Sequence, residues 1–176
     1  MATHTWNIDA SHSSISFSVR HMMIAKVRGA FGAFTGAITL DDAAFDKSSI
    51  TASIDVASIN TQDEKRDGHL KSPDFFDAAQ FPTMTFQSTR IAGSGDTFEV
   101  AGNLTLHGVT KEVKLEVERN GGGKDPWGNT RQAFSAKGHL NRKDFGLTYN
   151  QALETGGVLV GEKIDIEIEV SAVQAK

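Results

Sequence analysis

The sequence predicts an all-β, antiparallel domain, and two observations carry that prediction. Apolar and polar residues alternate with period two in many segments, so each predicted strand has one apolar and one polar face. Strands of parallel sheets covered by helices are continuous apolar runs instead. Connections rich in glycine and asparagine, around Gly108 and between Asn120 and Asn129, are typical of hairpin loops.

The alternating segments set the expected order of the strands along the chain. Their ranges are 13–21, 29–38, 48–58, 83–88, 97–108, 111–119, 133–142 and 163–172. About eight strands in one domain can pack as a two-sheet sandwich or close into a barrel. Small inward residues lie beside large ones and suggest room inside: Ala52, Gly102, Ala136 and Gly138. Alternation alone does not decide whether such a barrel is filled or hollow.

One short helix is predicted, over about residues 61–71. Thr61 is the expected N-cap, and Glu64 three residues later completes a capping box. Because so short a helix is marginal alone, it needs a docking surface. Leu70 and the phenylalanines of the segment DFFDAAQFP are expected to provide it. The helix is therefore expected to lie near one end of the strands, as a plug.

Length, charge and composition narrow the classes of function. The 176 residues suit a single domain, 1–176, and contain no cysteine, which excludes disulfides, thiolate metal sites and a cysteine nucleophile. The net charge of -4, with basic residues spread along the chain, gives no footprint for nucleic acid or an anionic membrane surface. The first residues lack signal-peptide features and no apolar run could cross a bilayer. We therefore expect a cytoplasmic protein without an integral membrane segment.

Few residues suggest catalysis or metal binding. Asp9, Ser11 and His12 lie close together in the sequence, but no G-x-S-x-G elbow accompanies them. The histidines are scattered, and Asp41 and Asp42 are expected to project into solvent. The sequence therefore predicts no catalytic site, no metal site and no cofactor.

Several motifs together resemble a known family. The segments DASHSSISFSVRHMMIAKVRGAFGAFTGAI, ASINTQDEKRDGHLKSPDFFDAAQFPTMTFQST, VAGNLTLHGVTKEV and NRKDFGL resemble, in order and spacing, motifs of the YceI-like family of bacterial lipid-binding proteins. The resemblance runs from Trp6 to about Val170; Lys143 stands where the family often has Ser or Thr. It implies a lipocalin-like antiparallel β-barrel, an elongated cavity for a long amphiphile such as a polyisoprenoid, a homodimer, and no established catalytic activity.

The expected function is non-catalytic binding, sequestration or transport of a long-chain amphiphilic lipid, most simply a polyisoprenoid. The residues expected to contact its tail are Phe17, Val19, Phe34, Ile54, Phe86, Phe98, Leu104 and Phe134. The polar residues expected at the rim, where a head group could bind, are His21, Arg66, His69, Asn141 and Arg142. Two alternatives stay open: an enzyme acting on an isoprenoid or lipid ester through Asp9, Ser11 and His12, and a structural module with a filled barrel.

Overall fold

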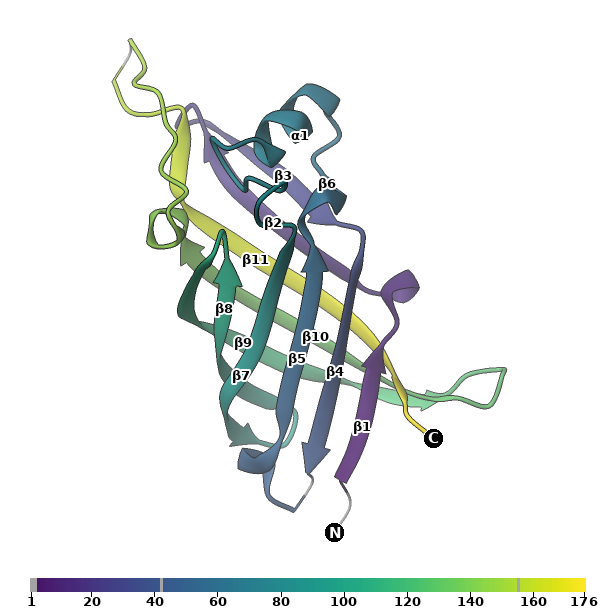
Figure 1. Cartoon of the computed structure of the whole chain (residues 1–176). Coiled ribbons are helices and arrows are strands. Elements are labelled where there is room, and N and C mark those ends of the chain that lie inside the picture. Colours follow the sequence, from purple (N-terminus) through teal and green to yellow (C-terminus); the bar gives the residue numbers. More distant parts are fainter. Residues whose placement is uncertain (1–2, 42, 155) are drawn as a thin grey trace.

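The antiparallel strands close into a barrel, which excludes the sandwich alternative (Figure 1). The structure, a computed structural model, describes residues 3–41, 43–154 and 156–176. Within these residues eleven strands pair in the order β1-β4-β5-β7-β8-β9-β10-β11-β2-β3-β6, and β1 also pairs with β11. That last pairing closes the sheet on itself, so the barrel wall has no free edge along this seam.

The strands vary in length from two residues to sixteen. Their bounds are β1 Thr3–Ile8, β2 Ser14–His21, β3 Ala25–Phe31, β4 Phe34–Asp41, β5 Ser49–Asp55, β6 Ile59–Asn60, β7 Thr83–Ser94, β8 Thr97–Leu106, β9 Val109–Lys124, β10 Thr130–Asn141 and β11 Val160–Gln174.

Three of the barrel strands are bent, and this reconciles eleven strands with the expected eight. β1 and β2 are separated by the 3-10 turn Ala10–His12, but β1 pairs with β4 and β2 with β3. β3 continues into β4 through Gly32 and Ala33, and β5 into β6 through the turn Val56–Ser58. Each bent pair therefore acts as one barrel strand beside β7 to β11. Every barrel strand pairs with its neighbour in the chain, as in an up-and-down barrel.

The loop predicted between Asn120 and Asn129 is shorter than expected. β9 continues through its glycines to Lys124, and the chain turns at Asp125–Asn129. A register shift opposite Ala133 accompanies the glycine run, where Gly121 has a φ of 104°. Glycine tolerates such a bulge, so the strand continues where the composition indicated a loop.

The α-helix α1 spans Glu64–Lys71, and it is the single α-helix among the described residues. It begins later than predicted because Asp63, and not Thr61, is the N-cap. The Asp63 carboxylate accepts hydrogen bonds from two amides of the first turn, at 3.0 and 3.1 Å. Thr61 is buried and donates both its N–H and its hydroxyl to Asp67, so its side chain is not available as a cap.

The helix lies at the upper end of the barrel in the view of Figure 1. No residue of α1 is buried, so the helix itself stands outside the barrel. The half-buried Leu70 and Phe76 and the buried Phe75 are the side chains that reach the interior. Phe81 packs instead on the ring of His107, with ring centroids 5.0 Å apart. The plug is therefore made by the end of the helix and the residues after it.

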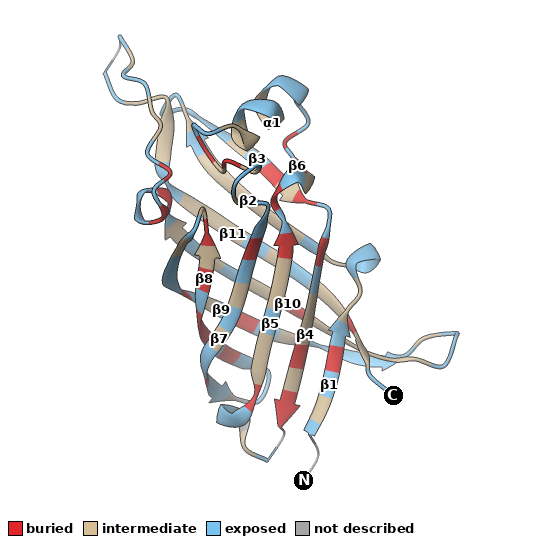
Figure 2. Cartoon of the chain, viewed as in Figure 1, coloured by how far each residue is buried: buried red, intermediate tan, exposed pale blue. Residues whose placement is uncertain are grey.

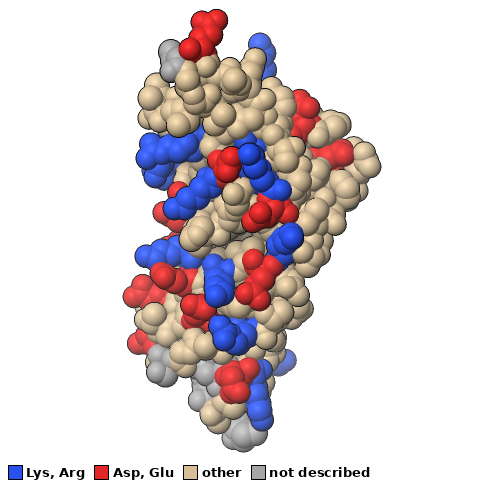
Figure 3. Space-filling view, turned by 90° about the vertical axis from the view of Figure 1, so that its left-hand side faces the viewer, with Lys and Arg blue, Asp and Glu red and all other residues tan. Residues whose placement is uncertain are grey.

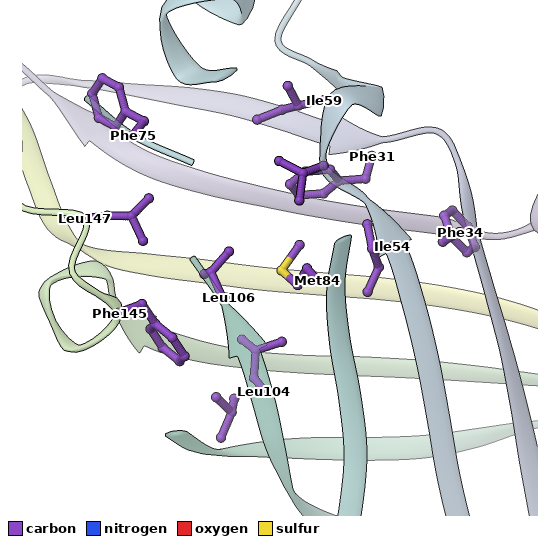
Figure 4. Packing of buried hydrophobic residues seen from close by; sticks show 12 residues of the cluster. Phe31, Phe34, Ile54, Ile59, Phe75, Met84, Leu104, Leu106, Phe145 and Leu147 are labelled. Carbon is purple, nitrogen blue, oxygen red and sulfur yellow. The ribbon is translucent and has the colours of Figure 1, made fainter. Parts of the chain in front are cut away.

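The buried apolar residues of the barrel form two clusters, an upper one nearer α1 and a lower one nearer the opposite end. Figure 2 marks the buried positions along the strands in red. The upper cluster comprises Phe31, Phe34, Ile54, Val56, Ile59, Phe75, Met84, Leu104, Leu106, Val113, Phe145 and Leu147, and most of it is seen in Figure 4. The lower cluster comprises Trp6, Ile38, Leu40, Ile91, Phe98, Val100, Val117, Phe134 and Ala172. Phe86 and Leu115 pack against both clusters.

One carboxylate expected in solvent is buried. Asp41, at the end of β4, is 6% exposed and accepts hydrogen bonds from the amides of Ala43 and Ala44, each at 3.0 Å. Its own N–H donates to the hydroxyl of Ser48. The prediction failed because this aspartate holds a turn rather than facing water; Asp42 lies outside the described residues.

Candidate functional site

An elongated cavity of about 240 Å³ lies inside the barrel. Among the described residues that line it, all but Ser16 and Arg142 are apolar. The lining extends along β8 from Leu106 to Phe98, which at a rise of ~3.3 Å per residue is about 26 Å along the strand. A typical strand tilt makes that about 20 Å along the barrel axis. So small a volume over such a length describes a narrow channel.

The expected room beside the small inward residues is partly filled. The ring of Phe86 covers Gly102, and a Cβ atom on Gly138 would lie 2.8 Å from Cδ2 of Leu115. These glycines let large neighbours lie flat on the barrel wall. Ala136, in contrast, lines the open channel.

The lower end of the channel is closed by side chains of the lower cluster that do not line it, among them Trp6 and Leu40. The upper end is covered by Leu70, Phe75, Phe76 and Leu147. Phe76 packs edge-on against Phe31 of β3, with ring centroids 5.9 Å apart. The cover belongs to short segments outside the wall strands, so the upper end is where a ligand could pass.

All of the residues expected to contact a ligand tail line this channel: Phe17, Val19, Phe34, Ile54, Phe86, Phe98, Leu104 and Phe134. In Figure 4, Phe34, Ile54, Met84 and Leu104 are seen around the same interior space. Met84 and Phe31 also line the channel, although they were not among the residues expected to contact the tail. Phe31 and Phe34 both line the channel although they are three residues apart, because the bend at Gly32 and Ala33 interrupts the alternation.

The polar rim candidates do not form a cluster. His21 was predicted to continue the inner face of β2, but it is half-buried and does not line the channel. β2 ends at this residue, and β11 has a register shift between Val160 and Ile164 opposite it. The regular alternation of β2 therefore ends before His21, and His21 does not continue its inner face.

Arg66, His69 and Asn141 make local contacts and do not line the channel either. Arg66 donates to the hydroxyl and the carbonyl of Thr61, at 2.8 and 2.6 Å. The Asn141 side chain caps a 3-10 turn by accepting the amide of Lys143. His69 is the nearest to the cover, because its ring packs edge-on against the ring of Phe75 at 5.0 Å.

Arg142 lines the channel but is not an exposed rim residue, since it is 3% exposed. Its guanidinium donates to four backbone carbonyl oxygens, those of Leu147, Tyr149, Val160 and Gly161, at 2.8, 2.8, 3.2 and 2.8 Å. Burial lowers the pKa of this guanidinium, and Glu162 opposes that change. The main contacts of Arg142 are therefore to the fold itself.

The cluster of Asp9, Ser11 and His12 does not have the geometry of a catalytic triad. Ser11 Oγ and Asp9 Oδ2 lie 3.1 and 2.9 Å from the same ring nitrogen, Nδ1 of His12. In a triad the serine and the acid contact opposite ring nitrogens. Ser11 Oγ also donates to Asp9 at 2.6 Å, and Arg131 pairs with Asp9 at 2.9 Å.

Arg131 joins this turn to the loop between β9 and β10. It contacts Asp9 at 2.9 Å and Asp125 at 2.7 Å. Hydrogen bonds from Ser11, then Arg131 and His12, lower the pKa of Asp9. Burial raises the pKa of Asp125, but hydrogen bonds from Arg131 and backbone amides outweigh it and lower that pKa to about 2. The cluster is a structural ion-pair network on the outside of the barrel.

No group of three or more His, Cys, Asp or Glu side chains in the part of the chain that the structure describes could hold a metal ion. None of the helices among the described residues is long and apolar enough to span a membrane.

Comparisons with known proteins agree with this geometry. A family model described as a YceI-like domain matches residues 6–172. A UPF0312 protein of Staphylococcus aureus is 40% identical over 168 residues, 95% of each chain. The crystal structure of BcnA from Burkholderia cenocepacia aligns with a TM-score of 0.81 and 26% identity, covering 93% of this chain and 98% of BcnA. A polyisoprenoid-binding domain from Saccharophagus degradans has a TM-score of 0.69 at 17% identity, covering 97% and 98%; at that identity it shows the shared fold.

Proposed function

The chain belongs to the YceI-like family, and from that premise we propose that its barrel binds and carries a long, linear, isoprenoid-type lipid without chemically changing it. The observation that carries this proposal is the lining of the channel, which is apolar apart from Ser16 and Arg142. Such a surface suits a ligand whose buried part has no hydrogen-bonding groups, because an unpaired polar group would be costly there.

The shape of the channel favours a linear chain. Its volume of about 240 Å³ lies below the ~300–1,000 Å³ of typical pockets for drug-sized ligands, although it is deep. A slender tail fits a narrow, deep space better than a fused ring system of the same mass. The flexible side chain of Met84 in the wall can adapt to the methyl branches of a prenyl tail.

Burial of the tail can supply the binding free energy. Each buried methylene contributes roughly 0.8 kcal/mol, whereas association costs roughly 4–15 kcal/mol of lost freedom. A short tail therefore gains little, and several isoprene units gain much. Since the lower end is closed by buried apolar residues, we place the head group at the upper end, near α1.

The alternatives have less support. An enzyme built on Asp9, Ser11 and His12 would need a serine and an acid on opposite nitrogens of the histidine, whereas both contact Nδ1. A filled barrel would leave no cavity of this size. The Saccharophagus degradans domain is described as polyisoprenoid-binding. We propose the same class of ligand for this chain.

Native mass spectrometry of the protein from its own host, followed by organic extraction, tests the proposal. We expect a bound mass that is released into the organic phase and identified as a chain of repeating isoprene units. Recovery of an empty protein, or of a lipid that the protein hydrolyses during incubation, would refute it. As a control, the variant Ala136→Phe places a ring in the channel and should carry less of the same lipid.

The expected assembly and location are part of the proposal. We expect a homodimer, which light scattering coupled to size-exclusion chromatography measures directly. We also expect the protein in the cytoplasmic fraction of its host, which immunoblotting of separated fractions checks.

A further inference from the structure

The turn between β2 and β3 exposes three consecutive large apolar side chains. Met22 is 45% exposed, Met23 57% and Ile24 82%. Trp127, in the loop between β9 and β10, is the other exposed large hydrophobic residue of the described chain. Single exposed apolar residues are ordinary, but a contiguous group often marks an interaction surface. We name residues 22–24 the hairpin tip.

The backbone of the hairpin tip is strained. The turn is closed by a hydrogen bond from the N–H of Ile24 to the carbonyl of His21, at 3.3 Å. Met22 and Met23 have φ values of 53° and 67°, where Asn and Gly are the favoured residues. Strain of this kind persists at functional sites, and here its effect is to hold apolar side chains outward.

The strands that carry the tip are basic. Residues 10–40 contain Arg20, Lys26 and Arg28 and no acidic residue, although the whole chain has a net charge of -4. Arg20 lies directly opposite Lys26, and within the described chain neither of them forms an ion pair. Like charges in this position repel unless an anion lies nearby.

Glu162 of β11 lies within the register shift between Val160 and Ile164, across from Arg20, and its carboxylate pairs with Lys143 at 2.7 Å. The other acidic residues of β11 lie further from the tip. Asp165 and Glu167 of β11 are opposite Ser18 and Ser16, towards the middle of β2. The exposed Glu154 belongs to the loop that contains Gly157, against which the side chain of Met23 lies. The basic and apolar groups are therefore concentrated at one end of the hairpin.

That end is also the upper end of the channel. Val19, two residues before His21, lines the channel, and so does Val160, which pairs with His21. In Figure 1 the turn lies at the same end of the barrel as α1. Figure 3 shows that the surface at this end is mostly uncharged, whereas Lys, Arg, Asp and Glu side chains are mixed over the side below.

We propose that the hairpin tip docks on the surface of an anionic lipid bilayer. Met22, Met23 and Ile24 enter the interfacial layer, and Arg20 and Lys26 contact anionic head groups. This brings the upper end of the channel to the membrane, from which a lipid can pass into the barrel. A second copy of the chain is a poorer occupant, because a two-fold contact at the tip would place the same unpaired cations against each other.

Vesicle co-sedimentation tests the docking, with vesicles of phosphatidylcholine alone and of equimolar phosphatidylcholine and phosphatidylglycerol. We expect the protein to bind the mixed vesicles and to leave them as salt is raised. Arg20→Gln with Lys26→Gln should weaken binding about 30-fold, at about 1 kcal/mol per basic residue near an anionic surface. Glu154→Gln should strengthen it.

The variant Met22→Asn with Met23→Gly replaces the tip by the sequence that its backbone favours, so it will fold, and we expect it to lose vesicle binding. Two controls are matched. Trp127→Ser removes an equally exposed apolar side chain elsewhere, and Lys114→Gln with Lys124→Gln removes the same charge from β9; both should bind as the unchanged protein does.

Equal binding to neutral and anionic vesicles, or unchanged binding by the Asn-Gly variant, would overturn the docking. So would a dimer that the Asn-Gly variant abolishes, without any vesicle binding, since the tip would then contact a second copy. The proposal does not depend on the ligand in the channel, because Ala136→Phe should still bind vesicles. Loss of lipid loading and loss of docking are thus separate results.

Discussion

Arg142 joins three segments at the upper end of the barrel through hydrogen bonds to four backbone carbonyl groups. Leaving such buried acceptors without donors costs about 1–3 kcal/mol each, partly relieved by relaxation. We expect Arg142→Met to lower the free energy of unfolding by about 3–5 kcal/mol, measured by urea denaturation. Arg142→Lys should recover a part of this loss, because the ammonium can reach fewer of the carbonyls.

The control for Arg142 is Arg90→Met, which removes an arginine that is 65% exposed and paired with Glu99 at 3.6 Å. An exposed pair of this kind contributes at most about 1 kcal/mol. Equal losses of unfolding free energy for the two variants would contradict the structural role of Arg142. A fully stable Arg142 variant that no longer binds lipid would instead indicate that Arg142 contacts the head group.

The network of Asp9, Asp125 and Arg131 predicts a pH dependence. Both carboxyl groups have pKa values below their unfolded values of ~3.9, that of Asp125 at about 2. Their stabilisation is therefore present above pH ~4 and is lost as the pH falls through the folded pKa values. We expect the difference in unfolding free energy between the protein and Arg131→Met to be constant from pH 7 to about 5 and to shrink from about pH 4 towards 2. A difference that grows on acidification would show that the network is not the cause.

At the residue scale, apolar positions were predictable and polar ones were not. Alternation identified Phe98 and Leu104 as lining residues because the side of a strand follows from its period of two. Asp41 and Arg142 were misplaced because each bonds to backbone groups of a turn, and which turn lies nearby depends on the fold. The sequence gives no signal for such partners until the turn itself is known.

The hairpin tip shows the balance between stability and exposure at the scale of an element. A left-handed backbone costs a residue other than glycine about 1–2 kcal/mol. Met22→Asn with Met23→Gly should therefore raise the unfolding free energy by about 1 kcal/mol, after the extra flexibility of glycine in the unfolded chain is subtracted. Thermal denaturation measures the change. Trp127→Ser should leave the midpoint unchanged, and a lower midpoint for the Asn-Gly variant would mean that the methionines stabilise the fold.

Most elements were predictable, but β1 and the interruptions of the strands were not. The longer strands were predicted because their alternation extends over several residues, and the helix because of its capping residues, whereas the six residues of β1 were not recognised as a strand. The bends at 10–12 and 56–58 are 3-10 turns of three residues, and the bend at 32–33 is a two-residue break between β3 and β4; none of them is long enough to show a period. The start of α1 was misplaced because Thr61 and Asp63 are both acceptable N-caps, and the burial of Thr61 decides between them.

Closure of the barrel belongs to the whole molecule and does not follow from local patterns. Closure of the barrel requires β11 to pair with β1 and β2, near the opposite end of the chain, and alternation names no partner for a strand. The net charge of -4 is a sum over the whole chain, so it concealed the basic segment of residues 10–40, which is visible when the charge is counted segment by segment.

The closed lower end of the channel predicts how affinity depends on ligand length. With about 20 Å between its two ends, the channel should bind prenyl chains more tightly with each added unit until it is full. Beyond that length the affinity should level off. Ala136 and Phe98 both pair with Val117 of β9, so Ala136 lies near the lower end of the channel. Ala136→Phe should therefore shorten the channel from below and move the plateau to shorter chains.

Titration of a series of prenyl alcohols by displacement of a fluorescent fatty chain measures the plateau. Lys137→Phe is the matched control, because it adds the same ring to the exposed outer face of β10 and should leave the plateau in place. Equal affinity for short and long chains would mean that the tail is not what the protein binds. A plateau that Ala136→Phe leaves unchanged would mean that the tail binds outside the channel, since a chain that enters from the upper end must meet the added ring before it reaches Trp6 and the closed lower end.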